Sequence, residues 1–268
     1  MNTGSQTAVL EIRNATKRFG AVLALNNVSV TLYEREVLAL LGDNGAGKST
    51  LIKAVSGVHR LDAGEIVVDG QAVTIRSPAG ARALGIETVY QDLALFDNLS
   101  AAQNFYAGRE LKRWGALRAC GLLRDRHMEQ ETARLLDSLE VRLPANSMAL
   151  VGLMSGGQRQ AVAVARAVAF ASRIVILDEP TAALGLRESR NVLRLVSRLA
   201  DHGIAVMLIS HNLEEVMTVA DRAVVLRQGR YVGEATPSPE NHATLVSLIV
   251  GASRYLANGD ANPVAHEP

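Results

Sequence analysis

The nine residues at 42–50, Gly-Asp-Asn-Gly-Ala-Gly-Lys-Ser-Thr, restrict the possible folds of this chain more than any other stretch. They match the pattern G-x-x-x-x-G-K-[ST], in which glycines allow consecutive backbone N–H groups to face the oxygens of a phosphate. The apolar residues 37–41 predict a buried strand before the loop, and residues 51–55 predict a helix after it. Because a helix N-terminus carries partial positive charge, this order of elements predicts a nucleotide site. It disfavours the alternative, a loop whose glycines serve only a tight turn.

The pattern assigns different tasks to the lysine and the hydroxyl of the loop. Lys48 is expected to reach the β- and γ-phosphates, and Ser49 is expected to hold Mg²⁺. The residues expected around the bound nucleotide are Gly42, Asn44, Gly45, Gly47, Lys48, Ser49 and Thr50.

The length and charge of the chain limit the classes of protein to which it can belong. At 268 residues it is expected to form one domain with an inserted subdomain. The formal net charge of +1 gives no global basic field, so nucleic acid is not expected as a partner. A single cysteine, Cys120, and the lack of a signal-peptide pattern predict a cytoplasmic location. The apolar stretch 161–177 contains Arg166 and Arg173, so membrane association is expected to be peripheral, through a partner.

The pattern of apolar residues differs between the N-terminal and the C-terminal parts of the chain. Residues 8–33 alternate between apolar and polar on either side of a turn near Phe19-Gly20, and residues 65–73 alternate around an Asp-Gly turn, which predicts an antiparallel layer. From residue 174 onward, unbroken apolar strands alternate with helices, which predicts an α/β sheet covered on both faces. The strands are expected at 174–177, 205–209 and 223–226, with helices at 186–201, 211–219 and 240–249.

The middle of the chain is expected to be helical. Residues 95–153 are interpreted as an inserted helical subdomain, with helices at 98–110 and 125–140, and a further helix is expected at 155–171. The stretch 109–126 has an excess of basic residues beside Trp114, and it is either a partner surface or a solvated helix face.

Polar residues end two of the predicted strands. Asp178 and Glu179 follow strand 174–177, where a carboxylate can help to hold Mg²⁺ or act as a base for water. Elsewhere such a pair is more often a helix cap or a solvated turn, but its position after a phosphate loop favours the catalytic reading. His211 ends the next strand, where its polar tip can face a ligand at the carboxyl edge of a parallel sheet.

Residues 154–160, Met-Ser-Gly-Gly-Gln-Arg-Gln, supply a second anion site and the resemblance to a family. Ser155 is expected to cap a helix whose free N–H groups lie beside glycines. The segment resembles the signature of the nucleotide-binding subunits of ATP-binding-cassette (ABC) transporters, usually Leu-Ser-Gly-Gly-Gln, with Met154 in place of leucine. The resemblance covers residues 8–250.

The resemblance implies a fold and a mode of assembly. The fold would be a P-loop NTPase (RecA-like) core with an antiparallel β layer, from residues 8–94 and 154–236, an inserted helical subdomain at 95–153, and a flexible tail at 251–268. Two cassettes would pair head to tail, so that each ATP is held by the phosphate loop of one subunit and the signature of the other. The signature residues that would contact ATP in trans are Ser155, Gly156, Gly157 and Gln158.

The resemblance also implies roles for single residues. Phe19, which lies 29 positions before Lys48, would stack on adenine; the alternative is that it packs in the core. Gln91 would sense Mg²⁺ and the γ-phosphate and would link the site to the helical subdomain. Glu179 would polarise the attacking water, and His211 would contact the γ-phosphate.

The resemblance also bears on the Mg²⁺ site and on one contact between the two subunits. Asp178, with Ser49 and Gln91, would complete the Mg²⁺ site. The loop 181–185 ends in Gly185 where the family usually has aspartate, so the aspartate contact across the dimer is not expected here.

The amino-acid sequences of three segments, 42–45, 90–95 and 180–185, resemble those of the ATP-binding subunits of ribose, fructose and xylose importers. Many of those relatives fuse two cassettes, whereas this chain has one. The resemblance implies an ATPase that drives monosaccharide uptake through a separate integral-membrane permease. The ATPase would be bound to this permease on the inner face of the membrane, and a solute-binding protein would be an indirect partner. Two alternatives remain open: an importer of a nucleoside or amino acid, and a soluble cassette that acts as an interaction module.

Overall fold

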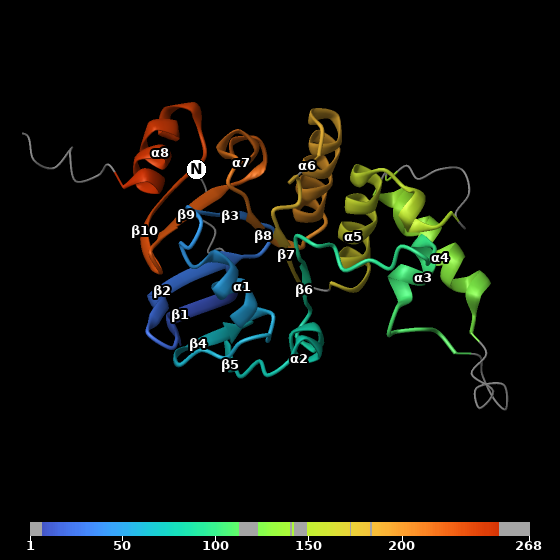
Figure 1. Ribbon diagram of the computed structural model, residues 1–268, viewed down its shortest axis with the longest axis horizontal. Helices are drawn as coiled ribbons and strands as arrows, with labels where there is room; N and C mark the ends of the chain where they lie inside the picture. Colours follow the sequence, from blue (N-terminus) through green and yellow to red (C-terminus); the bar gives the residue numbers. More distant parts are fainter. Residues whose placement is uncertain are drawn as a thin grey trace, which may run out of the picture.

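Two β-sheets lie against each other and form the framework of the structure (Figure 1). This computed structural model describes residues 7–112, 123–139, 141, 149–171, 173–182 and 184–251. The smaller sheet has the strand order β2-β1-β4-β5, and the larger has the order β10-β9-β3-β8-β7-β6. The combination of these sheets with helices confirms the predicted α/β class.

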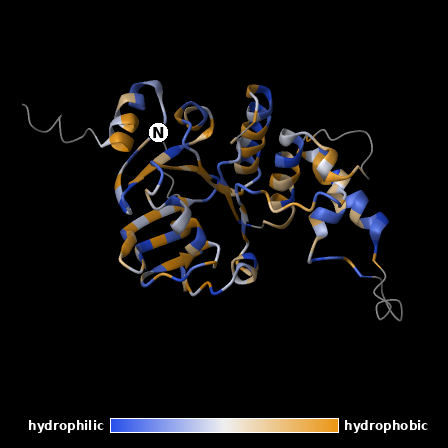
Figure 2. Ribbon diagram, in the orientation of Figure 1, coloured by the Kyte–Doolittle hydropathy of each residue, from blue (hydrophilic) through white to orange (hydrophobic). Residues whose placement is uncertain are grey.

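The smaller sheet is the predicted antiparallel layer. Its strands are β1 (Ala8–Phe19), β2 (Val22–Tyr33), β4 (Ala63–Val68) and β5 (Gln71–Val73), each antiparallel to its neighbours. Hydrophilic and hydrophobic bands alternate along it (Figure 2), because successive side chains of a strand point to opposite faces. Leu10, Ile12 and Leu32 are among the side chains that it buries against the larger sheet.

The larger sheet is mainly parallel. Its strands are β3 (Val37–Leu41), β6 (Ile86–Val89), β7 (Ile174–Asp178), β8 (Ala205–Ile209), β9 (Arg222–Arg227) and β10 (Arg230–Ala235). Only β10 is antiparallel to its neighbour, β9. Every residue of β3 and β8 is buried, as expected for strands covered on both faces.

The two faces of the larger sheet carry different layers. One face, which includes Leu40 and Ile176, packs with the smaller sheet and with α1 (Lys48–Val55). The opposite face, which includes Val175 and Leu208, packs with α5 (Gly156–Phe170) and α6 (Leu186–Asp201). At the β9 side this second face is continued by α7 (Leu213–Val219) and α8 (His242–Val250). Helices α1 and α5 therefore lie on opposite faces of the sheet (Figure 1).

The remaining helices correct some predicted boundaries. They are α2 (Pro78–Ala83), α3 (Ala101–Tyr106), α4 (Asp125–Ser138), and the 3₁₀ turns η2 (Val151–Leu153) and η3 (Pro239–Asn241). Helix α3 is shorter than the predicted 98–110, because Ser100 caps its start through a capping box and Gly108 turns the chain with φ 76°. Residues 240–241, expected at the start of the last helix, belong to the 3₁₀ turn η3.

Helices α3 and α4 lie beyond α5, at the end of the molecule farthest from the smaller sheet (Figure 1). Trp114, Cys120 and the tail at 252–268 lie outside the described residues. No helix within the described ranges is both long enough and apolar enough to cross a membrane.

Candidate functional site

Most of the predicted site residues follow the carboxyl ends of neighbouring parallel strands. The phosphate loop follows β3, Gln91 follows β6, Asp178 ends β7, and His211 follows β8. The register pairs Leu40 of β3 and Asp178 of β7 with the same residue of β8, Ile209. Because parallel strands end at one edge of a sheet, these residues gather at a single edge, as ligand-binding residues do in open α/β sheets.

The phosphate loop is a tight structure in which two glycines have no room for a side chain. Gly42 and Gly47 have φ angles of 144° and 104°. A Cβ at Gly42 would overlap the main-chain oxygen of Leu226, and one at Gly47 would lie 2.7 Å from the oxygen of Ala24. The neighbouring backbone alone therefore requires glycine at these two positions.

Lys48 is buried inside this loop. Its Nζ donates hydrogen bonds to the carbonyl oxygens of Gly42, at 2.5 Å, and Asp43, at 3.1 Å. Burial lowers the pKa of Lys48, while the carboxylates of Glu179 and Asp178 act in the opposite direction. The loop thus contains a preorganised cation close to the two predicted acidic residues.

A turn between β9 and β10 supports the phosphate loop, and the sequence did not assign it this role. Gly229 donates its N–H to the oxygen of Ala46 at 3.0 Å and accepts from the N–H of Asn26 at 2.7 Å. The Gln-Gly pair at 228–229 predicts only a hairpin turn. Its position over residues 42–47 depends on the pairing of β9 with β3, which local sequence does not show.

Substitution of two glycines of the loop by alanine should separate steric fit from backbone strain. Gly42→Ala is expected to lower the free energy of unfolding by about 3 kcal/mol or more and to abolish nucleotide binding, because its Cβ meets backbone. Gly45→Ala, at φ 81° with open space around its Cβ, should cost only about 1–2 kcal/mol. Urea unfolding and nucleotide titration measure both. Equal costs for the two variants would contradict the packing argument.

The two carboxylates lie in different environments. Burial raises the pKa of Asp178, the neighbouring Glu179 carboxylate raises it further, and Lys48 opposes this shift. Glu179 has a left-handed backbone, with φ 50°, and donates its N–H to the oxygen of Ile209. Such a conformation costs about 1–3 kcal/mol and persists where the surroundings enforce it. Neither residue is a helix cap, because the next helix, α6, begins after Gly185.

Glu179 and His211 meet across the sheet edge. Nδ1 of His211 lies 3.2 Å from Oε1 of Glu179, and the imidazole side chain is 68% exposed. Helix α7 begins after His211, contrary to the predicted start at 211, because Asn212 is the N-cap and accepts from the N–H of Glu214 at 3.1 Å. His211 is thereby left in the loop, where its side chain can face a ligand.

A third acidic residue, Glu215, joins the loops that carry Glu179 and His211. Its Oε2 accepts from the hydroxyl of Thr181 at 2.5 Å and lies 3.5 Å from that of Ser210. Both hydroxyl residues are buried. Sequence reasoning missed Glu215, since an acidic residue in the first turn of a helix is common at helix starts.

Phe19 lies at the surface, so the alternative of core packing is wrong. Its side chain is 43% exposed, and its ring meets the His59 ring edge to face, with the centroids 5.1 Å apart. The ammonium of Lys17 lies 5.5 Å from the centre of the same ring. Phe19 is therefore available for stacking against a planar ligand.

Ser155 caps α5 as expected. Its hydroxyl accepts from the N–H of Gln158 at 3.3 Å, and the Gln158 side chain accepts from the N–H of Ser155 at 3.0 Å. A Cβ at Gly157 would lie 2.5 Å from Cγ of Glu188. Because α5 and α1 cover opposite faces of the sheet, the signature and the phosphate loop of one chain do not adjoin.

Gln91 and the basic stretch complete the set of predicted residues. Gln91 is exposed in the loop after β6. Arg109, from the basic stretch, is not simply solvated: its Nη2 donates to Oε1 of Glu87 at 2.6 Å, and its guanidinium lies 4.2 Å from the centre of the Phe170 ring. Lys112 is exposed, and most residues between it and Arg124 lie outside the described ranges.

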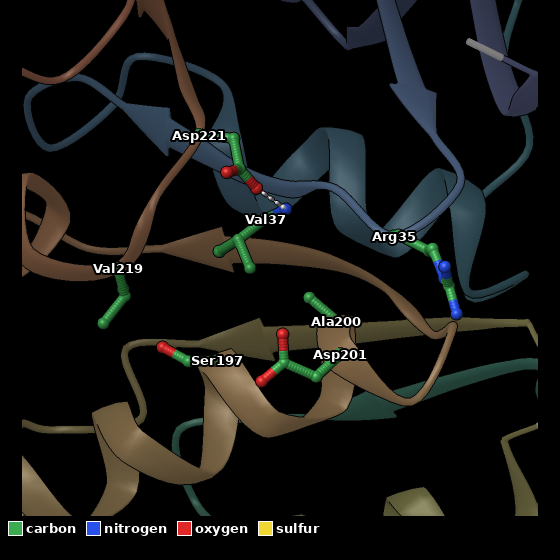
Figure 3. Close-up of a pocket in the computed structure, with 7 residues that line it drawn as sticks. All are labelled: Arg35, Val37, Ser197, Ala200, Asp201, Val219 and Asp221. Carbon is green, nitrogen blue, oxygen red and sulfur yellow. Dashed lines mark hydrogen bonds between the residues drawn. The ribbon is translucent and has the colours of Figure 1, made fainter.

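A separate cavity of about 350 Å³ lies at the opposite edge of the sheet (Figure 3). Arg35, Ser197, Asp201 and Asp221 are among its lining residues. The N–H of Val37, the first residue of β3, donates to Oδ2 of Asp221 at 2.8 Å. Since the phosphate loop follows the other end of β3, this cavity is not part of the predicted site.

Comparison with known proteins identifies the family. The sequence model described as "ABC transporter" matches residues 25–182. The chain is 49% identical to a xylose/arabinose import ATP-binding protein of Sulfolobus acidocaldarius, over 84% of this chain and 86% of that protein. It is 45% identical to a fructose import ATP-binding protein of Rhizobium meliloti, over 92% of this chain and 96% of that protein. A ribose import ATP-binding protein of Rubrobacter xylanophilus is also 45% identical, but the match spans only 47% of its length.

Solved structures support the same assignment at the level of the fold. A nucleotide-free ATP-binding cassette of an ABC transporter superposes with a TM-score of 0.76 at 23% identity, over 94% of this chain and all of that one. The ADP form of another such cassette gives 0.77 at 24% identity, over 94% and 99% of the two chains. With the family model matching more than half of the chain and close relatives matching most of it, this chain belongs to the ABC transporter family.

Proposed function

We propose that this chain is the ATP-hydrolysing subunit of an importer that takes up a monosaccharide through a separate membrane permease. The observation that carries the proposal is the 45% identity to a fructose import ATP-binding protein across 96% of that protein's length. The relatives named for xylose/arabinose and ribose import support the same class of solute. The chain would lie on the inner face of the membrane, bound to the permease, and would act indirectly on a solute-binding protein.

The residues at the sheet edge fit a bound nucleotide with its metal ion. Backbone N–H groups of residues 42–47 and the buried Lys48 ammonium would hold the phosphates, and Phe19 would stack on the base. Ser49, Gln91 and Asp178 would hold Mg²⁺, since all three offer the hard oxygen atoms that this ion prefers. Mg²⁺ neutralises charge on the phosphates when it is bound.

Glu179 is suited to act on the attacking water. Its carboxylate accepts a proton or orients the water, and Nδ1 of His211 at 3.2 Å from Oε1 restrains it in place. Phosphoryl transfer requires mainly positioning and charge neutralisation, so a fixed base and a fixed cation are the principal contributions of the protein. His211 itself, with an exposed ring, would contact the γ-phosphate.

The arrangement also supports a head-to-tail pair of cassettes. One chain contains two helix ends suited to anions, at α1 and α5, on opposite faces of the sheet. They can serve one nucleotide only if they come from different subunits. ATP would then close the dimer, hydrolysis would reopen it, and Ser155, Gly156, Gly157 and Gln158 would complete the site of the partner.

Reconstitution in liposomes tests the proposed function. The chain, its permease and the sugar-binding protein should show ATP hydrolysis that rises roughly 5-fold or more when the binding protein carries its monosaccharide, which is the lower end of typical coupling between two binding sites. Binding proteins loaded with a nucleoside or an amino acid serve as controls. Stimulation only by one of those solutes would move the proposal to the other importer class, and co-purification with nucleic acid without a permease would reject it.

A further inference from the structure

Arg166 connects the signature helix to the loop that carries Gln91. Arg166 lies in α5, which begins at the signature residues. Its Nη1 donates to the oxygen of Ala94 at 2.8 Å, and its Nη2 donates to the oxygen of Leu93 at 3.1 Å. These carbonyls are two and three residues after Gln91. One planar guanidinium therefore binds two consecutive peptide groups through two different nitrogen atoms, whose spacing the single ammonium nitrogen of lysine does not reproduce.

The loop that Arg166 holds is strained. Leu93 and Ala94 have left-handed backbones, with φ angles of 59° and 45°, although neither is glycine. Two short-range hydrogen bonds shape the loop, from the N–H of Leu93 to the oxygen of Tyr90 and from the N–H of Ala94 to the oxygen of Asp92. A non-glycine residue keeps such a conformation only where other contacts enforce it. From α5, the two bonds of Arg166 reach the strained residues themselves, and the ion pair of Arg159 with Asp97, at 3.0 Å, holds the chain a few residues further on.

The nearby carboxylate does not occupy the N–H donors of Arg166, which bind the carbonyls of Leu93 and Ala94 instead. The nearby carboxylate of Glu87 accepts instead from Arg109 at 2.6 Å, and Arg109 is itself stacked on Phe170 near the end of α5. Burial lowers the pKa of Arg166, the charge of Arg109 lowers it further, and the carboxylate of Glu87 opposes the shift. The guanidinium nevertheless stays charged, as arginine does in proteins. The helix α5, strand β6 and the Gln91 loop are thus joined by two arginines with distinct partners.

We propose that Arg166 is a positioning residue for Gln91: it fixes residues 91–94 against the signature helix, so that Gln91 reaches the nucleotide only while α5 is in place. The proposal rests on the proposed function, because the task of Gln91 at the nucleotide belongs to it. Movement of the signature helix during dimer closure would then be transmitted to the Gln91 loop within the same subunit.

A double-mutant cycle tests whether Arg166 acts through Gln91. Arg166→Met in the full chain should lower kcat about tenfold with KM within about twofold of the parent, but should lower it less than about twofold in a Gln91→Ala background. Arg166→Lys should show an intermediate loss of about threefold, since lysine keeps the positive charge and a donor but lacks the two spaced nitrogen atoms of the guanidinium. Equal losses in both backgrounds would overturn the proposal.

Hydrogen exchange gives a readout that does not depend on activity. In Arg166→Met, exchange of the amides at 91–96 should rise about threefold or more, while the amides of α5 and β6 keep the parental rate and show that the fold is intact. Arg134→Met, in an exposed pair with Glu131 on α4, is the matched control and should change neither kcat nor exchange. Unchanged exchange at 91–96 in Arg166→Met would overturn the proposal. This result can be distinguished from failure of the proposed function. If the proposed function were wrong, Glu179→Gln would hydrolyse ATP at the parental rate.

Discussion

Glu179→Gln is expected to bind ATP within about twofold of the parent and to hydrolyse it roughly 10²- to 10⁴-fold more slowly, the usual effect of losing a general base. Glutamine keeps the size of glutamate and can still bond to Nδ1 of His211, which lies 3.2 Å from Oε1. It cannot accept the proton of the attacking water. Nucleotide titration and single-turnover phosphate release measure the two quantities separately.

Two further variants make this result specific. Glu214→Gln removes an exposed acidic side chain from the first turn of α7, near the same loop, and should stay within about twofold of the parent. Glu179→Asp keeps the charge but withdraws it from the water by one methylene, so its turnover should fall between those of the parent and Glu179→Gln. Parental hydrolysis by Glu179→Gln would remove this residue from its proposed role.

Mixing two inactive variants should restore ATP hydrolysis if the site is shared between subunits. Glu179→Gln has a defective catalytic half, and Gly156→Val has a defective signature half, so each alone should hydrolyse ATP at least about 10²-fold more slowly than the parent. Random pairing makes half of the dimers mixed, and each mixed dimer has one complete site. The mixture should therefore reach about a quarter of the parental rate.

The Gly156 substitution is chosen because its effect should remain local. The nearest atom to a Cβ at this position would be the terminal Cδ2 of Leu184, at 3.5 Å, which is an ordinary contact with a flexible side chain. A chain with both substitutions has neither an active catalytic half nor an active signature half, so it should stay inactive at any concentration. No recovery in the mixture, or parental hydrolysis whose rate per chain does not depend on concentration, would contradict a site shared between subunits.

Features that depend on nearby residues were predictable from the sequence. The turn at Asp69-Gly70 and the cap at Ser155 were both expected, and the structure confirms them. In each case the hydrogen bonds join residues no more than a few positions apart. The strands 37–41 and 205–209 could also be predicted, because an unbroken run of apolar residues is typical of a strand that is buried on both faces.

Features that depend on distant residues were missed or left open. Gly229 supports the phosphate loop, Glu215 joins the loops of Glu179 and His211, and Arg166 holds the loop after Gln91 across 72 positions of the chain. Each residue also fits an ordinary local role, in a turn, a helix start or a helix surface. No short pattern separates these roles, since the partner is unknown until the chain is folded.

By itself, the sequence determined the residue patterns on which the proposed chemistry rests: a phosphate-loop pattern at 42–50, carboxylates at 178 and 179, and a second helix start suited to anions at 155–158. Only the tertiary structure decided that α1 and α5 cover opposite faces of the sheet and that Phe19 is exposed. The physical reason is that the strand order β9-β3-β8-β7-β6 places side by side strands that are far apart in the chain. Periodicity and capping are local properties, whereas the choice of sheet neighbours and of the covered face is made by the packing of the whole core.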